Sequence, residues 1–213
     1  PRNSLSCPVH RPDHAFSGGM VALLFAIPIN GALICIGWGI DILSADEAQN
    51  IVAGHVWTGI GLVCTSLVAL VASVVRQIQN TYSGADRRFW PGLVIVMGTI
   101  DILWGLYLLI FQYSPVTIAP GFVLIGLGIV CYSILSKVLL LALVWRHPYP
   151  LAKRIPLIPV LTALICLFIA AFLFEAATSN PAYMVPARVM VGLGGICFTL
   201  FSIVSILESG TSS

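Results

Sequence analysis

The chain has 213 residues, of which 59% are hydrophobic and 8% are charged, with a net charge of +2. Soluble domains carry about 25% charged residues, so this composition excludes a soluble catalytic domain and predicts an integral membrane protein whose main partner is the lipid bilayer. The weak and scattered basic charge excludes a nucleic-acid-binding surface, so no nucleic acid is expected as a partner.

Six stretches with little or no charge follow one another along the chain, and each is long enough to cross a bilayer, which takes about 20 apolar residues. They cover residues 15–40, 51–75, 89–111, 117–145, 155–174 and 184–207. Segments rich in proline, glycine and asparagine separate them and mark helix ends. The predicted fold is all-α, a polytopic transmembrane bundle of six helices. Residues 1–14 are predicted to form a polar tail, 15–210 the transmembrane domain and 211–213 a second short tail.

Basic residues predict the orientation of these helices. Eight of the ten Lys and Arg residues fall in the amino-terminal tail and in the second and fourth connections: Arg2, Arg11, Arg76, Arg87, Arg88, Arg146, Lys153 and Arg154. Connections that carry Lys and Arg remain in the cytoplasm. Both ends of the chain are therefore predicted to be cytoplasmic.

An internal repeat divides the predicted helices into pairs. The pattern G-x-G-x-x-C occurs three times, with 67 and then 66 residues between equivalent positions, at Gly59, Gly61 and Cys64, at Gly126, Gly128 and Cys131, and at Gly192, Gly194 and Cys197. The dipeptide Trp38-Gly39 likewise precedes Trp104-Gly105 by 66 residues. The pattern predicts three tandem two-helix hairpins, at about 15–80, 81–148 and 149–210, in parallel orientation.

The nine residues of the repeated pattern are interpreted as helix-packing positions, because small residues let helices approach closely in lipid. A phosphate-binding loop is excluded, since the pattern lies inside a spanning helix. The cysteines have no intramembrane histidine beside them and no close spacing, so no metal site is expected. No cofactor is expected either.

Two charged residues lie inside predicted spans. Asp101 is near the middle of the third helix and Lys137 is in the fourth. A charge at such a depth costs at least about 2.5–3.5 kcal/mol and marks a candidate functional site. One hypothesis makes Asp101 a proton or solute site with Lys137 as its counter-charge. The other has Asp101 protonated or hydrogen-bonded to Tyr132 and Ser133, while Lys137 extends to the interface.

A second candidate site lies at the outer ends of the helices, where the repeat aligns His55 with Phe122 and Arg188. Histidine titrates near physiological pH, so His55, Arg188 and Glu175 form a candidate pH-sensing outer face. The alternative is that His55 is a polar anchor, and that Arg188 contacts a lipid headgroup or pairs with Glu175.

Several segments resemble the YhiM family of enterobacterial inner-membrane proteins. They are residues 52–56 (VAGHV), 76–82 (RQIQNTY), 119–146 and 192–208 (GLGGICFTLFSIVSILE). The resemblance covers roughly 25–210 and implies a multi-pass protein of the bacterial inner membrane that is associated with acid-stress survival. Members are longer at the amino-terminal side, so the resemblance implies that this chain is a carboxy-terminal portion. The family has no assigned catalytic residue to carry over.

Two functions are compatible with these features. The first is support of acid-stress survival by movement of protons or a small solute, and the alternative is a non-transporting scaffold or stress-response interaction protein. An enzyme is not expected, because the chain has no HExxH motif and no nucleophile motif. Other copies of the chain, or the missing amino-terminal hairpins, are the expected protein partners.

Overall fold

The computed structural model describes residues 18–45, 51–79, 81–144 and 157–211. Over these ranges it is all-helical, and six of its helices are long and apolar enough to cross a membrane, as predicted. The elements are α1 (Gly18–Ser44), α2 (Ile51–Ile78), α3 (Asp86–Ile110), α4 (Pro115–Val144), α5 (Leu157–Ala177), a 3₁₀ turn η2 (Pro181–Tyr183) and α6 (Met184–Thr211).

The helix bounds differ from the predicted ones by a few residues. Helix α3 begins at Asp86, three residues before the predicted stretch, because Asp86 accepts hydrogen bonds from the backbone N–H and the hydroxyl of Ser83 at its first turn. Helix boundaries defined by hydropathy stop at the first charge, whereas the backbone hydrogen bonds continue beyond it. The predicted amino-terminal tail and most of the fourth connection, with Arg2, Arg11 and Lys153, lie outside the described residues.

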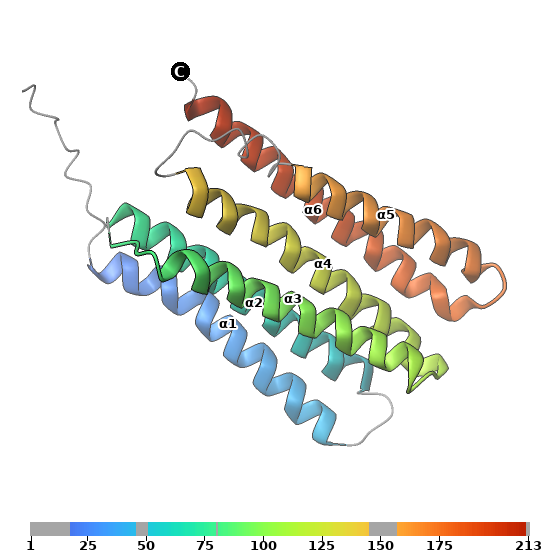
Figure 1. Ribbon diagram of the computed structural model, residues 1–213. Helices are drawn as coiled ribbons and strands as arrows, with labels where there is room; N and C mark the ends of the chain where they lie inside the picture. The colour runs from blue at the N-terminus through green and yellow to red at the C-terminus, as the bar shows by residue number, and fades with distance from the viewer. Residues whose placement is uncertain (1–17, 46–50, 80, 145–156, 212–213) are drawn as a thin grey trace, which may run out of the picture.

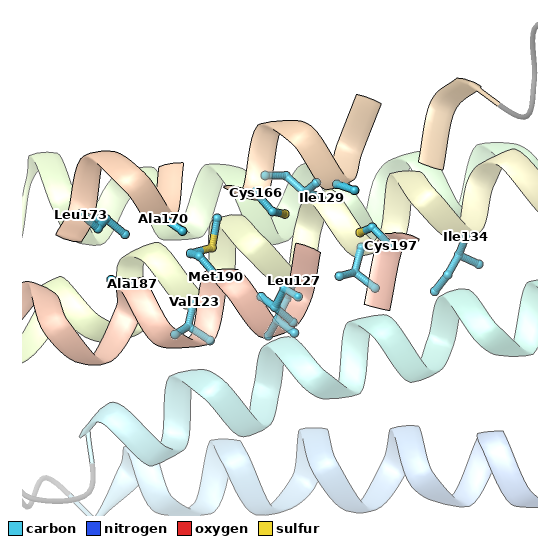
Figure 2. Packing of buried hydrophobic residues seen from close by; sticks show 13 residues of the cluster. Val123, Leu127, Ile129, Ile134, Cys166, Ala170, Leu173, Ala187, Met190 and Cys197 are labelled. Atoms are coloured by element: carbon cyan, nitrogen blue, oxygen red, sulfur yellow. The ribbon is translucent and has the colours of Figure 1, made fainter. Parts of the chain in front are cut away.

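Helix α4 is at the centre of the bundle. It contacts α2, α3, α5 and α6, and Figure 1 shows it between the group formed by α1, α2 and α3 and the pair formed by α5 and α6. The largest apolar cluster lies between α4, α5 and α6 and includes Leu127, Cys166 and Met190 (Figure 2). This central position explains why α4 is the most buried of the six helices, although its sequence is as apolar as that of its neighbours.

Glycines set the contacts within each pair of helices. A Cβ atom at Gly105 of α3 would lie 2.5 Å from the carbonyl oxygen of Gly121 on α4, and a Cβ atom at Gly121 would lie 3.2 Å from that of Gly105. In the first pair, Gly39 of α1 meets the backbone of Gly54 on α2 in the same manner. Such backbone-to-backbone contact is possible only without a side chain at these positions.

Substitution of Gly105 by leucine is expected to destabilise the protein by about 1–3 kcal/mol, because the new side chain would force α3 and α4 apart. Thermal unfolding in detergent measures the effect. A Cβ atom at Gly92 on the same helix would meet no atom within 4 Å, so Gly92→Leu is the control and is expected to leave stability unchanged or slightly higher. Equal melting temperatures for the two variants would contradict the close contact at Gly105.

Polar side chains fasten one end of the bundle, where α2 and α4 end and α3 begins. Asp86 forms an ion pair with Arg76 at 2.6 Å and accepts a hydrogen bond from the indole N–H of Trp90. Gln77 and Arg87 donate to the carbonyl oxygens of Leu141 and Ala142 at the last turn of α4. These bonds satisfy carbonyl groups that a helix end leaves without partners.

Candidate intramembrane site

Asp101 lies at the junction of three helices. It is fully buried on α3, and a Cβ atom at Gly59 of α2 would be 3.2 Å from its Oδ1 atom. The same Gly59 position faces Leu124 and Leu127 of α4 at 2.5 and 2.9 Å. The carboxyl group is therefore enclosed by α2, α3 and α4, with apolar side chains nearby.

Neither oxygen of the Asp101 carboxyl group has a hydrogen-bond partner among the described residues. An unpaired carboxylate inside a membrane protein costs several kcal/mol. Charge at this position therefore requires water, a cation or a nearby donor, and without them a bound proton is required. A group with these properties can bind and release a proton when its access to water changes.

His55 and Trp104 form a ring contact beside Asp101. Their ring centroids are 5.5 Å apart in an edge-to-face arrangement. His55 precedes Gly59 by four residues on α2, and Trp104 follows Asp101 by three residues on α3, so the pair lies about 5–6 Å farther along the bundle. His55 is 9% exposed, and its Nδ1 atom has no partner among the described residues. The structure thus places two partnerless titratable groups one helical turn apart.

The expected hydrogen bonds from Asp101 to Tyr132 and Ser133 are absent from the described part of the chain, so this part of the interpretation is wrong. The Tyr132 hydroxyl is 2.8 Å from the hydroxyl of Thr99, which lies two residues before Asp101. The Ser133 hydroxyl is buried without a partner in the described ranges. Tyr132 is directed to Thr99 because both lie on the surface where Gly98 and Gly128 bring α3 and α4 together.

Lys137 is buried on a different side of α4. It is 7% exposed, and its Nζ atom has no partner among the described residues. Lys137 follows Ser133 by one turn and Gly126 by three turns, and Gly126 packs against Met190 and Leu193 of α6. Residues at such spacings share one face of a helix. Lys137 therefore lies toward α6, and the described structure gives no ion pair between it and Asp101.

The residues of the predicted outer face are not brought together. Glu175 and Arg188 are exposed, and they do not form an ion pair in the described ranges. His55 is buried against Trp104 and is separated from both. A role of these residues in pH sensing remains a prediction, and His55 belongs by position to the surroundings of Asp101.

Eight of the nine residues predicted to pack helices lie at helix contacts or are at least partly buried. Gly61, Gly128 and Gly194 each face the partner helix of their own pair, whereas Gly59 and Gly126 face the next pair. Cys131 and Cys197 are fully buried, and Cys64 is half-buried. Gly192 is the exception, because no atom lies within 4 Å of a Cβ placed on it.

Sequence reasoning missed two polar contacts of this region. The Ser66 hydroxyl donates to the Cys131 thiol at 3.4 Å and joins α2 to α4, and Trp104 covers His55. Both residues occur at repeated positions: Ser66 follows Cys64 by two residues, as Ser133 follows Cys131. This recurrence was the available indication that the position meets a neighbouring hairpin.

Comparison with known proteins supports the resemblance found in the sequence. Residues 1–212 match the family described as "Protein of unknown function (DUF2776)". The chain is 48% identical over 202 residues to inner membrane protein YhiM of Escherichia coli (strain K12), and the alignment covers 94% of this chain and 58% of that protein. The chain thus spans little more than half the length of this relative. No solved structure matches the chain.

The YhiM resemblance is confirmed by this identity, and the six apolar helices agree with a protein that crosses the inner membrane several times. The chain belongs to the DUF2776 family of membrane proteins of unknown function.

Proposed function

We propose that this protein moves protons or a small solute across the inner membrane and that Asp101 binds the transported species. The observation that carries the proposal is the Asp101 carboxyl group, which is fully buried inside α3 with neither oxygen hydrogen-bonded in the described structure. A packing role would be served better by an apolar residue, because an unpaired acid inside a membrane is unfavourable. A transport role supplies the reason for its presence.

The surroundings of Asp101 support a route from one end of the bundle. His55 lies on α2 between Gly59 and the first residue of the helix. Its Nδ1 atom, which has no partner in the described structure, is a suitable donor or acceptor one turn away from the carboxyl group. Proton transfer over such a step needs a water molecule or a side-chain movement. In this proposal His55 is the group that precedes Asp101 on the route.

The physiological role follows from the resemblance. The YhiM family is associated with survival of acid stress, and movement of protons or of a proton-consuming solute would serve that purpose. We extend this role to the present chain. The cytoplasmic placement of both termini, which the basic residues predict, makes the His55 side of α2 the outer side.

A scaffold without transport activity is the second candidate. It is favoured by the close packing around Asp101, where Gly59, Leu124 and Leu127 leave little space between α2 and α4. In a scaffold the helices would serve as a rigid surface for partner proteins. Asp101 would then contribute only to the stability of the bundle.

Three tandem hairpins form the architecture that we propose for this function. Equivalent residues make equivalent contacts in all three pairs: Gly61 faces Ile36 and the carbonyl of Ala32, Gly128 faces Ile102 and the carbonyl of Gly98, and Gly194 faces Leu167 and the carbonyl of Ala163. These contacts support descent of the three pairs from one unit. Only the central unit carries a buried acid at its odd helix, since Cys35 and Leu167 occupy the equivalent positions.

Reconstitution of the full chain in proteoliposomes tests the transport proposal. A pH step across the membrane is expected to produce a flux, measured with an internal pH-sensitive dye, that protein-free liposomes do not show. A scaffold would leave the two preparations equal at every pH. It would instead be recovered from detergent-solubilised membranes with a defined partner protein.

A further inference from the structure

Two contacts between neighbouring hairpins use equivalent residues. Gly59 of α2 faces Leu124 and Leu127 of α4. Gly126 of α4 faces Met190 and Leu193 of α6. Each residue of the second contact lies 66 or 67 residues after its counterpart in the first. The surface by which α2 binds α4 is therefore used again when α4 binds α6.

Polar residues follow the same rule. The Ser66 hydroxyl of α2 donates to the Cys131 thiol of α4 at 3.4 Å, and Ser133 of α4 lies beside Cys197 of α6. The third residue of this series is Thr199 of α6. In the described structure its hydroxyl donates within its own helix, to the carbonyl oxygens of Gly195 and Ile196.

The corresponding surface of α6 is uncovered. We call it the α6 face and define it by Val185, Arg188, Gly192, Gly195, Ile196 and Thr199, all of which are exposed. Their counterparts on α2 and α4 are buried or half-buried. Side-chain exposure is 60% at Val185 and 49% at Ile196. The surface that α2 and α4 cover with the next hairpin is thus open on α6.

Contact with lipid alone does not account for the composition of the α6 face. Glycine disfavours a helix by about 1 kcal/mol relative to alanine, and this loss is compensated when a neighbouring helix packs closely on the glycine. Gly59 and Gly126 have that compensation, but a Cβ atom placed on Gly192 or Gly195 would meet no atom of the described chain within 4 Å. The α6 face therefore has the features of an interface that awaits a helix of the same kind.

We propose that the α6 face binds α2 of a second copy of this chain, in the manner in which α4 binds α2 and α6 binds α4 within one copy. The surface that would be received is the counterpart of Leu124 and Cys131, which is formed on α2 by Trp57 and Cys64. It is uncovered in part, since Trp57 is 42% exposed. The proposal rests on the tandem-hairpin architecture and continues an interface that the chain already makes twice.

Such an interface joins two different surfaces, so each copy keeps a free α6 face or a free α2 surface until the assembly closes. Head-to-tail contacts of this type close into rings when the rotation permits and otherwise continue. The first product of association is a dimer in which a fourth hairpin follows the third.

Substitution of Gly192 by leucine tests the proposal without disturbing the single copy. The new side chain meets open space in one copy but would collide with a docked α2, as a Cβ atom at Gly59 would collide with Leu124. We expect the wild-type full chain in liposomes, labelled for single-molecule photobleaching, to form dimers that Gly192→Leu weakens by at least about tenfold. Thermal unfolding in detergent is expected to be unchanged.

Gly37→Leu is the matched control. Gly37 is an exposed glycine of α1, where an added Cβ atom would meet nothing within 4 Å, and its counterpart in the second hairpin is the exposed Leu103. This variant is expected to associate like the wild type. The proposal is overturned if the wild type stays monomeric at every protein density, which would leave the α6 face to lipid, or if Gly192→Leu associates as tightly as Gly37→Leu.

Disulfide formation identifies the two surfaces. The contact between Ser66 and Cys131 predicts that Thr199→Cys of one copy lies beside Cys64 of the other. Oxidation is expected to yield a covalent dimer that disappears when Cys64→Ala is added. Leu161→Cys, on the exposed side of α5, is the control and should not crosslink. A wild-type dimer without this crosslink would show that another surface associates and would overturn the proposal.

These outcomes are independent of the transport activity. Loss of dimers by Gly192→Leu with unchanged flux separates association from transport, because Asp101 lies between α2, α3 and α4 of one copy. Absence of flux in a preparation that forms Gly192-dependent dimers would reject the transport proposal alone.

Discussion

Substitution of Asp101 by asparagine is expected to reduce the pH-dependent flux of the reconstituted chain to the level of protein-free liposomes. Asparagine has nearly the same shape as aspartate, so the contacts with Gly59 and the neighbouring apolar residues remain. The amide cannot bind or release a proton in the physiological range. Flux measured with an internal pH-sensitive dye after a pH step gives the result directly.

Glu175→Gln is the matched control for this experiment. It also replaces a carboxylate by an amide, but Glu175 is exposed at the end of α5. Its flux is expected to equal that of the wild type. Retention of wild-type flux by Asp101→Asn, with an unchanged melting temperature, would reject Asp101 as the transport site. Absence of flux in the wild type would favour the scaffold.

The six helices could be predicted because each span needs a long apolar stretch, and few other structures satisfy backbone hydrogen bonds in lipid. The packing role of Gly59, Gly126 and Gly128 could also be predicted, since small residues at a constant spacing have one main use in membrane helices. In both cases the physical constraint acts along the chain, where it leaves a pattern in the sequence.

The partners of Asp101 could not be predicted, because they depend on how each helix is rotated about its axis. The depths of Asp101 and Tyr132 are compatible with a hydrogen bond, but Tyr132 bonds to Thr99 instead. His55 was assigned to the outer surface from its position near the start of a helix, whereas Trp104 buries it. Hydropathy contains depth but not the direction in which one side chain faces.

Substitution of Lys137 by methionine is expected to raise the free energy of unfolding by about 1–3 kcal/mol, because it removes a buried amine that has no hydrogen-bond partner in the described structure. Methionine retains the length of the chain and suits an apolar neighbourhood. Thermal unfolding in detergent measures the change. Arg76→Met is the control with the opposite sign, since Arg76 forms an ion pair with Asp86 and its loss is expected to lower stability by up to about 1 kcal/mol.

The same variant decides whether Lys137 acts together with Asp101. Lys137 lies on the side of α4 that Gly126 turns toward α6, whereas Asp101 faces α2. Residues without a shared contact have additive effects, within about 0.5 kcal/mol. The double variant Asp101→Asn, Lys137→Met is therefore expected to show the sum of the two single changes, and Lys137→Met alone to retain the Asp101-dependent flux. A coupling energy well above that limit would require a pair between the two residues and would place Lys137 in the transport site.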